Sequence, residues 1–155
     1  MIHRIISGGQ TGADQGGLDF ALSCGLDCGG MCPHGRRSEA GPIPSHYPLT
    51  EHASWKYPPR TEANVKNSDA TLIFAWKPES TGTALTERLC WAFDKPFKTI
   101  HTKDPEQAAI EAREFLRQLP DHATLNIAGN RESQGLGLCK FVISALERCR
   151  DLFET

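Results

Sequence analysis

The stretch that decides the fold is Ile5-Ile6-Ser7-Gly8-Gly9-Gln10-Thr11-Gly12-Ala13-Asp14, near the start of the chain. It passes from apolar residues to a glycine pair, then to hydroxyl and amide side chains, and then into a segment with helical spacing. A helix that follows a strand in this way begins with N–H groups that lack partners, at the positive end of the helix dipole. Such a turn binds anions. The stretch therefore predicts a phosphate-binding turn that later loops close over.

The alternation of strand and helix patterns continues along the rest of the chain. Strands are expected at 3–7, 28–32, 70–76, 97–101 and 124–128. Helices are expected at 13–24, 60–66, 84–93, 105–118 and 138–152, the second of them capped by Thr61. Alternating elements on short connections predict a Rossmann-like three-layer α/β fold with a mostly parallel sheet of about five strands. The whole chain, 1–155, is expected to form a single ligand-binding domain.

The segment 33–59 has no periodicity and is punctuated by six prolines. A loop of this length inside a compact domain usually has a function. Trp55 lies in it, and we expect its ring either to pack or to stack on the base of a ligand.

Charge and composition exclude several classes of protein. A net charge of -2 at pH 7 argues against a surface built to bind nucleic acid. No apolar run reaches the ~20 residues that span a bilayer, and the first residues lack a signal-peptide pattern. We expect a cytoplasmic protein without a nucleic-acid or membrane partner. The first three of its six cysteines are spaced C-x3-C-x3-C, unlike a zinc or redox motif, so free thiols and no structural metal are expected.

Groups suited to phosphate follow four of the five predicted strands. They are Gly8, Gly9, Gln10, Thr11 and Gly12 after the first strand, Arg36 and Arg37 after the second, Ser80, Gly82 and Thr83 after the third, and Gly129, Arg131 and Glu132 after the fifth. Each group alone has a structural explanation: turn packing, surface arginines, a helix N-cap or a surface ion pair. Because ligands of such sheets lie beyond the carboxyl ends of the strands, the four groups together predict a phosphorylated ligand.

Two carboxylates need separate interpretations. Asp14 stabilises the dipole of the first helix, or it binds a ribose hydroxyl or a metal attached to the ligand. Glu87 lies about one turn into the helix after Gly82-Thr83, where it either acts as a general acid or base or forms a surface contact.

The chain resembles the molybdenum cofactor carrier family, within the SLOG superfamily of Rossmann-like nucleotide-binding proteins that includes the cytokinin-activating phosphoribohydrolases. The matching stretches are IISGGQTGADQGGLDFAL, CPHGRRSEAGPIPSHYPL, RTEANVKNSDATLIF, STGTALT and LNIAGNRES. The resemblance implies a homo-oligomer, a dimer or tetramer, that binds molybdopterin or a nucleotide through its phosphate. It places the terminal phosphate at 8–12, with Arg36 and Arg37 closing from the long loop. Gly82 and Thr83 would form a second anion-binding helix start, with 129–132 as the remaining wall.

One departure bears on catalysis. The phosphoribohydrolases carry a G-G-x-G-T-x-x-E motif, but here Thr86 stands three residues after Thr83, and Glu87 comes one later. One residue is about 100° of helical rotation, so Glu87 is displaced from the catalytic position.

The primary hypothesis is therefore a binding or carrier protein for a phosphorylated cofactor, most of all the molybdenum cofactor, without catalytic residues. The alternative is a nucleoside-monophosphate phosphoribohydrolase that cleaves an N-glycosidic bond with the help of Glu87. Trp76, Trp91 and Phe93 offer an apolar surface for contact between copies.

Overall fold

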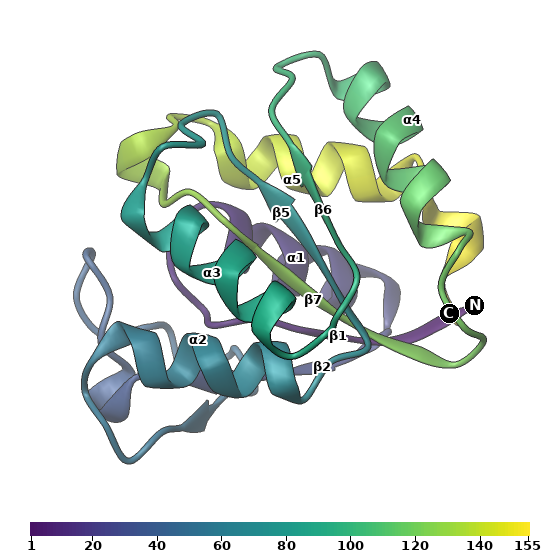
Figure 1. Ribbon diagram of the computed structural model, residues 1–155. Helices are drawn as coiled ribbons and strands as arrows, with labels where there is room; N and C mark the ends of the chain where they lie inside the picture. The colour runs from purple at the N-terminus through teal and green to yellow at the C-terminus, as the bar shows by residue number, and fades with distance from the viewer.

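In the computed structural model, which describes residues 1–155, parallel strands form one central sheet with helices on both faces (Figure 1). The sheet contains β1 (Ile2–Ile6), β2 (Asp27–Gly29), β5 (Ala70–Phe74), β6 (Phe97–Ile100) and β7 (Ala123–Gly129). The helices are α1 (Ala13–Cys24), α2 (Tyr57–Lys66), α3 (Thr81–Ala92), α4 (Pro105–Leu116) and α5 (Leu138–Glu147). The strand order is β2-β1-β7-β5-β6, and every pairing is parallel. The predicted Rossmann-like three-layer fold is confirmed.

The connections determine where a ligand fits. From β1 the chain passes through α1 to β2 on one side, whereas from β5 it passes through α3 to β6 on the other. Helices α1 and α5 lie behind the sheet in Figure 1, and α2 and α3 lie in front of it. This reversal of direction opens a crevice beyond the carboxyl ends of β1, β7 and β5.

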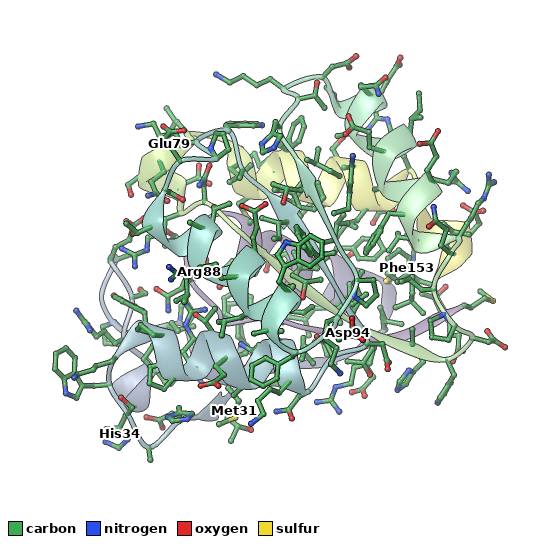
Figure 2. All side chains as sticks on the ribbon, in the orientation of Figure 1. Met31, His34, Glu79, Arg88, Asp94 and Phe153 are labelled. Atoms are coloured by element: carbon green, nitrogen blue, oxygen red, sulfur yellow. The ribbon has the colours of Figure 1, made fainter.

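Alternate residues of β7 serve the two faces of the sheet. Leu125 and Ile127 are fully buried, and Ile127 lies directly against Gly17 of α1. Asn126 points to the opposite face, toward α2 and α3. The core behind the sheet is completed by Phe153, labelled in Figure 2, whose ring packs edge-on against Phe20 at 5.0 Å. A buried apolar face and a polar front face of one strand separate the core from the crevice.

The predicted strand 28–32 is wrong in its extent. Gly30 has φ +125°, and an added Cβ would lie 2.0 Å from the carbonyl oxygen of Ser7. This turn ends β2 and starts β3 (Met31–Cys32), which pairs with β4 (Thr50–Glu51) in a separate two-stranded sheet. The long loop therefore contains a strand and a short 3-10 helix, His34–Arg36.

Two helices begin earlier than the sequence pattern indicates. Helix α2 starts at Tyr57, with prolines in its first turn, and Thr61 lies one turn inside it and is not the cap. Helix α3 starts at Thr81 and is capped by Ser80, whose hydroxyl oxygen accepts the N–H of Thr83 at 3.3 Å. The last helix ends at Glu147 and is followed by a short 3-10 turn, Arg150–Leu152. Both early starts bring helix residues to the crevice.

Candidate functional site

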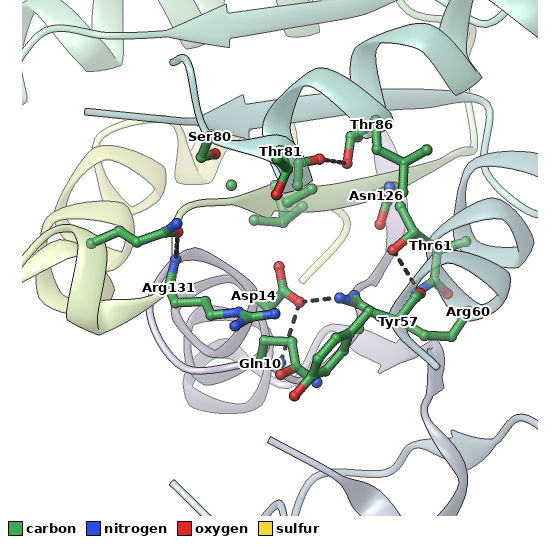
Figure 3. Close-up of a pocket in the computed structure, with 18 residues that line it drawn as sticks. Gln10, Asp14, Tyr57, Arg60, Thr61, Ser80, Thr81, Thr86, Asn126 and Arg131 are labelled. Atoms are coloured by element: carbon green, nitrogen blue, oxygen red, sulfur yellow. Dashed lines mark hydrogen bonds and ion pairs between the residues drawn. The ribbon is translucent and has the colours of Figure 1, made fainter. Parts of the chain in front are cut away.

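A pocket of about 140 Å³ lies in the crevice, between the first turn, α2, the start of α3 and the end of β7 (Figure 3). It is lined mainly by polar side chains and backbone. The lining residues are Gly8, Gln10, Asp14, Tyr57, Arg60, Thr61, Asn64, Ser80, Thr81, Gly82, Leu85, Thr86, Asn126, Ile127, Ala128, Gly129, Arg131 and Gln134.

Two N–H groups of the first turn are bonded to side chains of the protein itself. Asp14, which is buried, accepts the backbone N–H of Gln10 at 3.2 Å and Nη1 of Arg60 at 3.4 Å. Burial raises the pKa of Asp14, and the positive charge of Arg60 opposes that shift. The hydroxyl oxygen of Ser7 accepts a hydrogen bond from the N–H of Gly9 at 3.3 Å. One N–H of the turn, that of Gln10, therefore already binds an anionic group of the protein itself, the carboxylate of Asp14.

The three glycines of the first turn are explained by close packing within the protein. A Cβ on Gly8 would lie 1.8 Å from Nη1 of Arg60. On Gly9 (φ +73°) it would lie 2.3 Å from Cδ1 of Leu49, in the long loop. On Gly12 (φ +84°) it would lie 2.5 Å from a backbone oxygen of the β7–α5 loop. Side chains and backbone from three other segments therefore press directly on this turn.

Three arginines surround the ring of Tyr57. The guanidinium carbons of Arg37 and Arg131 each lie 4.5 Å from its centroid, and that of Arg60 lies 5.7 Å away. Arg60 and Arg131 line the pocket, and Figure 3 shows them on opposite sides of Asp14. With one buried carboxylate against two guanidinium groups, the pocket has a net positive charge that suits a phosphate.

The start of α3 forms the far wall. Thr81 and Gly82 line the pocket, whereas Thr83 is buried and accepts the Ser80 hydroxyl at 2.9 Å. A Cβ added to Gly82 would meet no atom within 4 Å. The backbone at Gly82 therefore borders open space, and the next N–H of the helix, that of Thr83, is capped by Ser80.

The end of β7 is held by side chains that turn away from the pocket. Asn130 accepts the N–H of Lys77 at 2.7 Å and donates to the carbonyl of the same residue at 3.1 Å. Glu132 accepts the N–H groups of Gly137 and Cys139 at the start of α5, at 2.5 and 3.0 Å. Gly129 does line the pocket. Its position requires glycine, because a Cβ there would lie 2.0 Å from the carbonyl oxygen of Phe74 on β5.

The long loop is fastened to both neighbouring segments. Glu39 accepts the hydroxyls of Thr11 and Ser133, each at 2.5 Å. The guanidinium of Arg36 donates to the carbonyls of Ile43, Pro44 and Tyr47, at 3.0, 2.6 and 3.0 Å. These contacts direct Thr11 and Arg36 into the loop and away from the pocket.

The family model of the circularly permutated YpsA SLOG family matches residues 5–150. The chain belongs to this family. A solved structure named "Putative molybdenum carrier protein", from Syntrophus aciditrophicus, is 37% identical in sequence. The match covers 95% of this chain and 94% of that chain, with a TM-score of 0.87. No curated protein matches. The resemblance to SLOG molybdenum carriers drawn from the motifs is confirmed, and family and neighbour support a ligand-binding role.

In this SLOG protein, half of the residues predicted from the motifs reach the pocket. Those lining it are Gly8, Gln10, Asp14, Ser80, Gly82, Gly129 and Arg131. Those lying outside it are Gly9, Thr11, Gly12, Arg36, Arg37, Thr83 and Glu132. Arg37 is exposed at the rim, where its guanidinium stacks on Trp55 at 4.8 Å. The exposed Trp55 does not line the pocket either.

Sequence reasoning missed the contribution of α2. Tyr57, Arg60, Thr61 and Asn64 all face the pocket. The signal was present in Pro58-Pro59, because proline is favoured in the first turn of a helix. A helix that starts at Tyr57 presents 57, 60, 61 and 64 on one face.

Glu87, the catalytic residue of the alternative hypothesis, faces the sheet edge. It accepts the hydroxyl of Thr99 on β6 at 3.2 Å and is absent from the pocket lining. Thr86, one residue earlier, lines the pocket in its place. The structure thus separates Glu87 from the ligand site by the expected fraction of a helical turn.

No group of three or more His, Cys, Asp or Glu side chains is arranged to hold a metal ion. All six cysteines are free, and burial raises the pKa of Cys139 to about 12, so that thiol is protonated at neutral pH. The chain contains no helix with the length and apolar character that a membrane crossing demands.

Proposed function

We propose that the protein binds and carries a phosphorylated cofactor or nucleotide, with the molybdenum cofactor as the first candidate. The observation that carries the proposal is the pair of guanidinium groups, Arg60 and Arg131, that flank the pocket across from the open start of α3. A phosphate between them would accept charge-assisted hydrogen bonds from the two guanidinium groups. It would also accept hydrogen bonds from N–H groups at the start of α3. The molybdenum carrier name of the 37% identical neighbour supports the choice of cofactor.

The residues present fit the organic part of that cofactor. Arg60 and Arg131 suit its phosphate, and the amide and hydroxyl groups of α2, α3 and β7 suit a heterocycle with polar edges. With no cluster of metal ligands in the chain, the protein would hold the cofactor through its organic part.

Arg131 offers the cleaner test of the two arginines, because Arg60 also neutralises Asp14. Replacing Arg131→Gln should weaken binding of GMP by about 10- to 100-fold, the effect of losing a charge-assisted hydrogen bond. Isothermal titration calorimetry measures the change. Arg88→Gln is the matched control: Arg88 is exposed on α3, outside the pocket (Figure 2). Equal affinity of the two variants would contradict the proposal. Mass spectrometry of material that copurifies with the wild type identifies the natural ligand.

One observation favours a second function, hydrolysis of an N-glycosidic bond. Asp14 is a buried carboxylate that lines the pocket and has a raised pKa, the properties of a general acid. Chromatographic detection of free base from GMP or AMP decides between the functions. Turnover that is lost in Asp14→Asn and kept in Glu87→Gln would assign the acid, whereas no release of base leaves binding alone.

We further propose that copies of the chain associate, as the resemblance implies. Trp91 is 77% exposed on α3 and its ring packs edge-on against Phe97 at 5.8 Å, which forms an apolar surface next to an edge strand. Sedimentation analysis of the wild type and of Trp91→Glu tests whether copies associate through this surface. A monomer in both cases would contradict association, and an oligomer unaffected by Trp91→Glu would assign the contact elsewhere.

A further inference from the structure

The end of the pocket opposite to Arg131 is lined by hydroxyl groups that already donate their protons to backbone carbonyls. Figure 3 shows Thr61, Thr86 and Asn126 gathered there. Thr61 donates to the carbonyl of Tyr57 at 3.1 Å, and Thr86 donates to the carbonyl of Gly82 at 3.0 Å. A hydroxyl has one proton and two lone pairs. Each threonine therefore presents an acceptor to the cavity.

The floor of the same end is also an acceptor. Asn126, only 3% exposed, points from the front face of β7 into the pocket. Its Nδ2 donates to the hydroxyl oxygen of Thr71 on the adjacent strand, at 3.2 Å. This bond uses one of the two amide protons, and in this orientation the carbonyl oxygen of Asn126 is available to a ligand as an acceptor.

Asp14 adds a fourth acceptor between the two ends of the pocket. One of its carboxylate oxygens binds Gln10 and Arg60. Figure 3 shows the other oxygen directed into the cavity. Four acceptors thus line the space beyond the predicted phosphate position, and a ligand that leaves a buried acceptor unpaired loses affinity.

We propose that this pocket selects, among phosphorylated compounds, those whose far end carries N–H donors, such as the amino group and ring N–H of a guanine-like ring. A compound with acceptors at that end would meet the lone pairs of Thr61, Thr86 and Asn126. The inference rests on the proposed function, because it takes the phosphate to lie between Arg131 and the start of α3.

GMP and IMP form a matched pair of probes, since IMP lacks only the 2-amino group of GMP. Calorimetric titration of the whole protein should show GMP binding about tenfold tighter than IMP, the effect of leaving one buried acceptor unpaired. In the double variant Thr61→Val/Thr86→Val, the preference should shrink to about twofold or less, because GMP loses more affinity than IMP. Thr99→Val, which changes a threonine on β6 outside the pocket, is the control and should keep the tenfold preference.

The outcomes separate this inference from the proposed function. Binding of both nucleotides with equal affinity by the wild type would overturn the donor selectivity and leave the phosphate site standing. A preference for GMP that survives in the double variant would overturn the assignment to Thr61 and Thr86. Failure of both nucleotides to bind would overturn the proposed function, and the selectivity with it. Thermal denaturation of each variant verifies that it is folded.

Discussion

Two of the glycine-bearing turns that lead from a strand into a helix differ in what lies against them. In the turn after β1, Gly8, Gly9 and Gly12 each lie against another part of the protein. The N–H groups of Gln10 and Gly9 are bonded within the protein, by Asp14 and Ser7. In the turn after β5, a side chain on Gly82 would meet open space, and the first residues of α3 border the pocket. Both patterns look alike in the sequence.

The comparison separates two uses of glycine. In the first turn glycine lets Arg60, Leu49 and the β7–α5 loop approach the backbone, so its loss destabilises the protein. At the start of α3 glycine leaves room for something outside the protein. We therefore propose that the phosphate lies across the pocket from 8–12, between the two arginines and the start of α3. Asp14, which follows the first turn, lines the same pocket and pairs with Arg60.

The largest effect is expected at Gly12. Gly12→Ala places a Cβ at φ +84° and 2.5 Å from a backbone oxygen, so left-handed strain of about 1–2 kcal/mol adds to overpacking of about 1–3 kcal/mol. Urea denaturation should show a loss of about 4 kcal/mol. Gly41→Ala is the matched control, because Gly41 has φ +94° and no atom within 4 Å of an added Cβ. Equal losses in the two variants would show that strain alone explains Gly12, and would break the comparison.

The next effect concerns the pair that fills the first turn. Arg60→Gln removes the charge that opposes the raised pKa of Asp14, so that pKa should rise further. An aspartate with a raised folded pKa contributes stability below its unfolded pKa of about 4 and loses it as the pH rises through the folded value. We expect a loss of about 3 kcal/mol at pH 7, from an uncompensated buried charge, that shrinks toward pH 4.

The control for that pH dependence is the double variant Asp14→Asn/Arg60→Gln, which has no carboxylate to titrate at this position. Its difference from the wild type between pH 4 and 7 should be nearly flat in comparison with that of Arg60→Gln. A single variant whose loss is the same at both pH values would place the effect in packing of the Arg60 side chain and not in the charge of Asp14.

These contacts also show which features of the structure can be predicted from the sequence. Local signals predicted the order of the elements and the bounds of α1 because periodicity and the Gly25 stop act over a few residues. The Asp14–Arg60 pair joins positions 46 residues apart, and no local pattern predicts it. Glu132 appeared suited to a ligand, but the N–H groups of α5 bind it. The motifs located the correct strand ends, while tertiary contacts decided which side chains face the pocket.

The smallest effect on stability, and the sharpest on binding, is expected at Gly82. Gly82→Ala should stabilise the protein by up to 1 kcal/mol (about the glycine–alanine difference in helix propensity), because the added Cβ meets nothing. The same methyl group enters the space proposed for the phosphate, so GMP binding should fall about tenfold.

Urea denaturation and calorimetry on Gly82→Ala measure the two quantities separately. Ala84→Ser, which adds one atom to the same helix outside the pocket, should change neither by much. A stabilised Gly82→Ala protein with weakened binding is a result that misfolding does not produce, because misfolding lowers both. Full affinity in Gly82→Ala would mean that the ligand keeps away from α3, and the two glycine turns would then differ in packing but not in function.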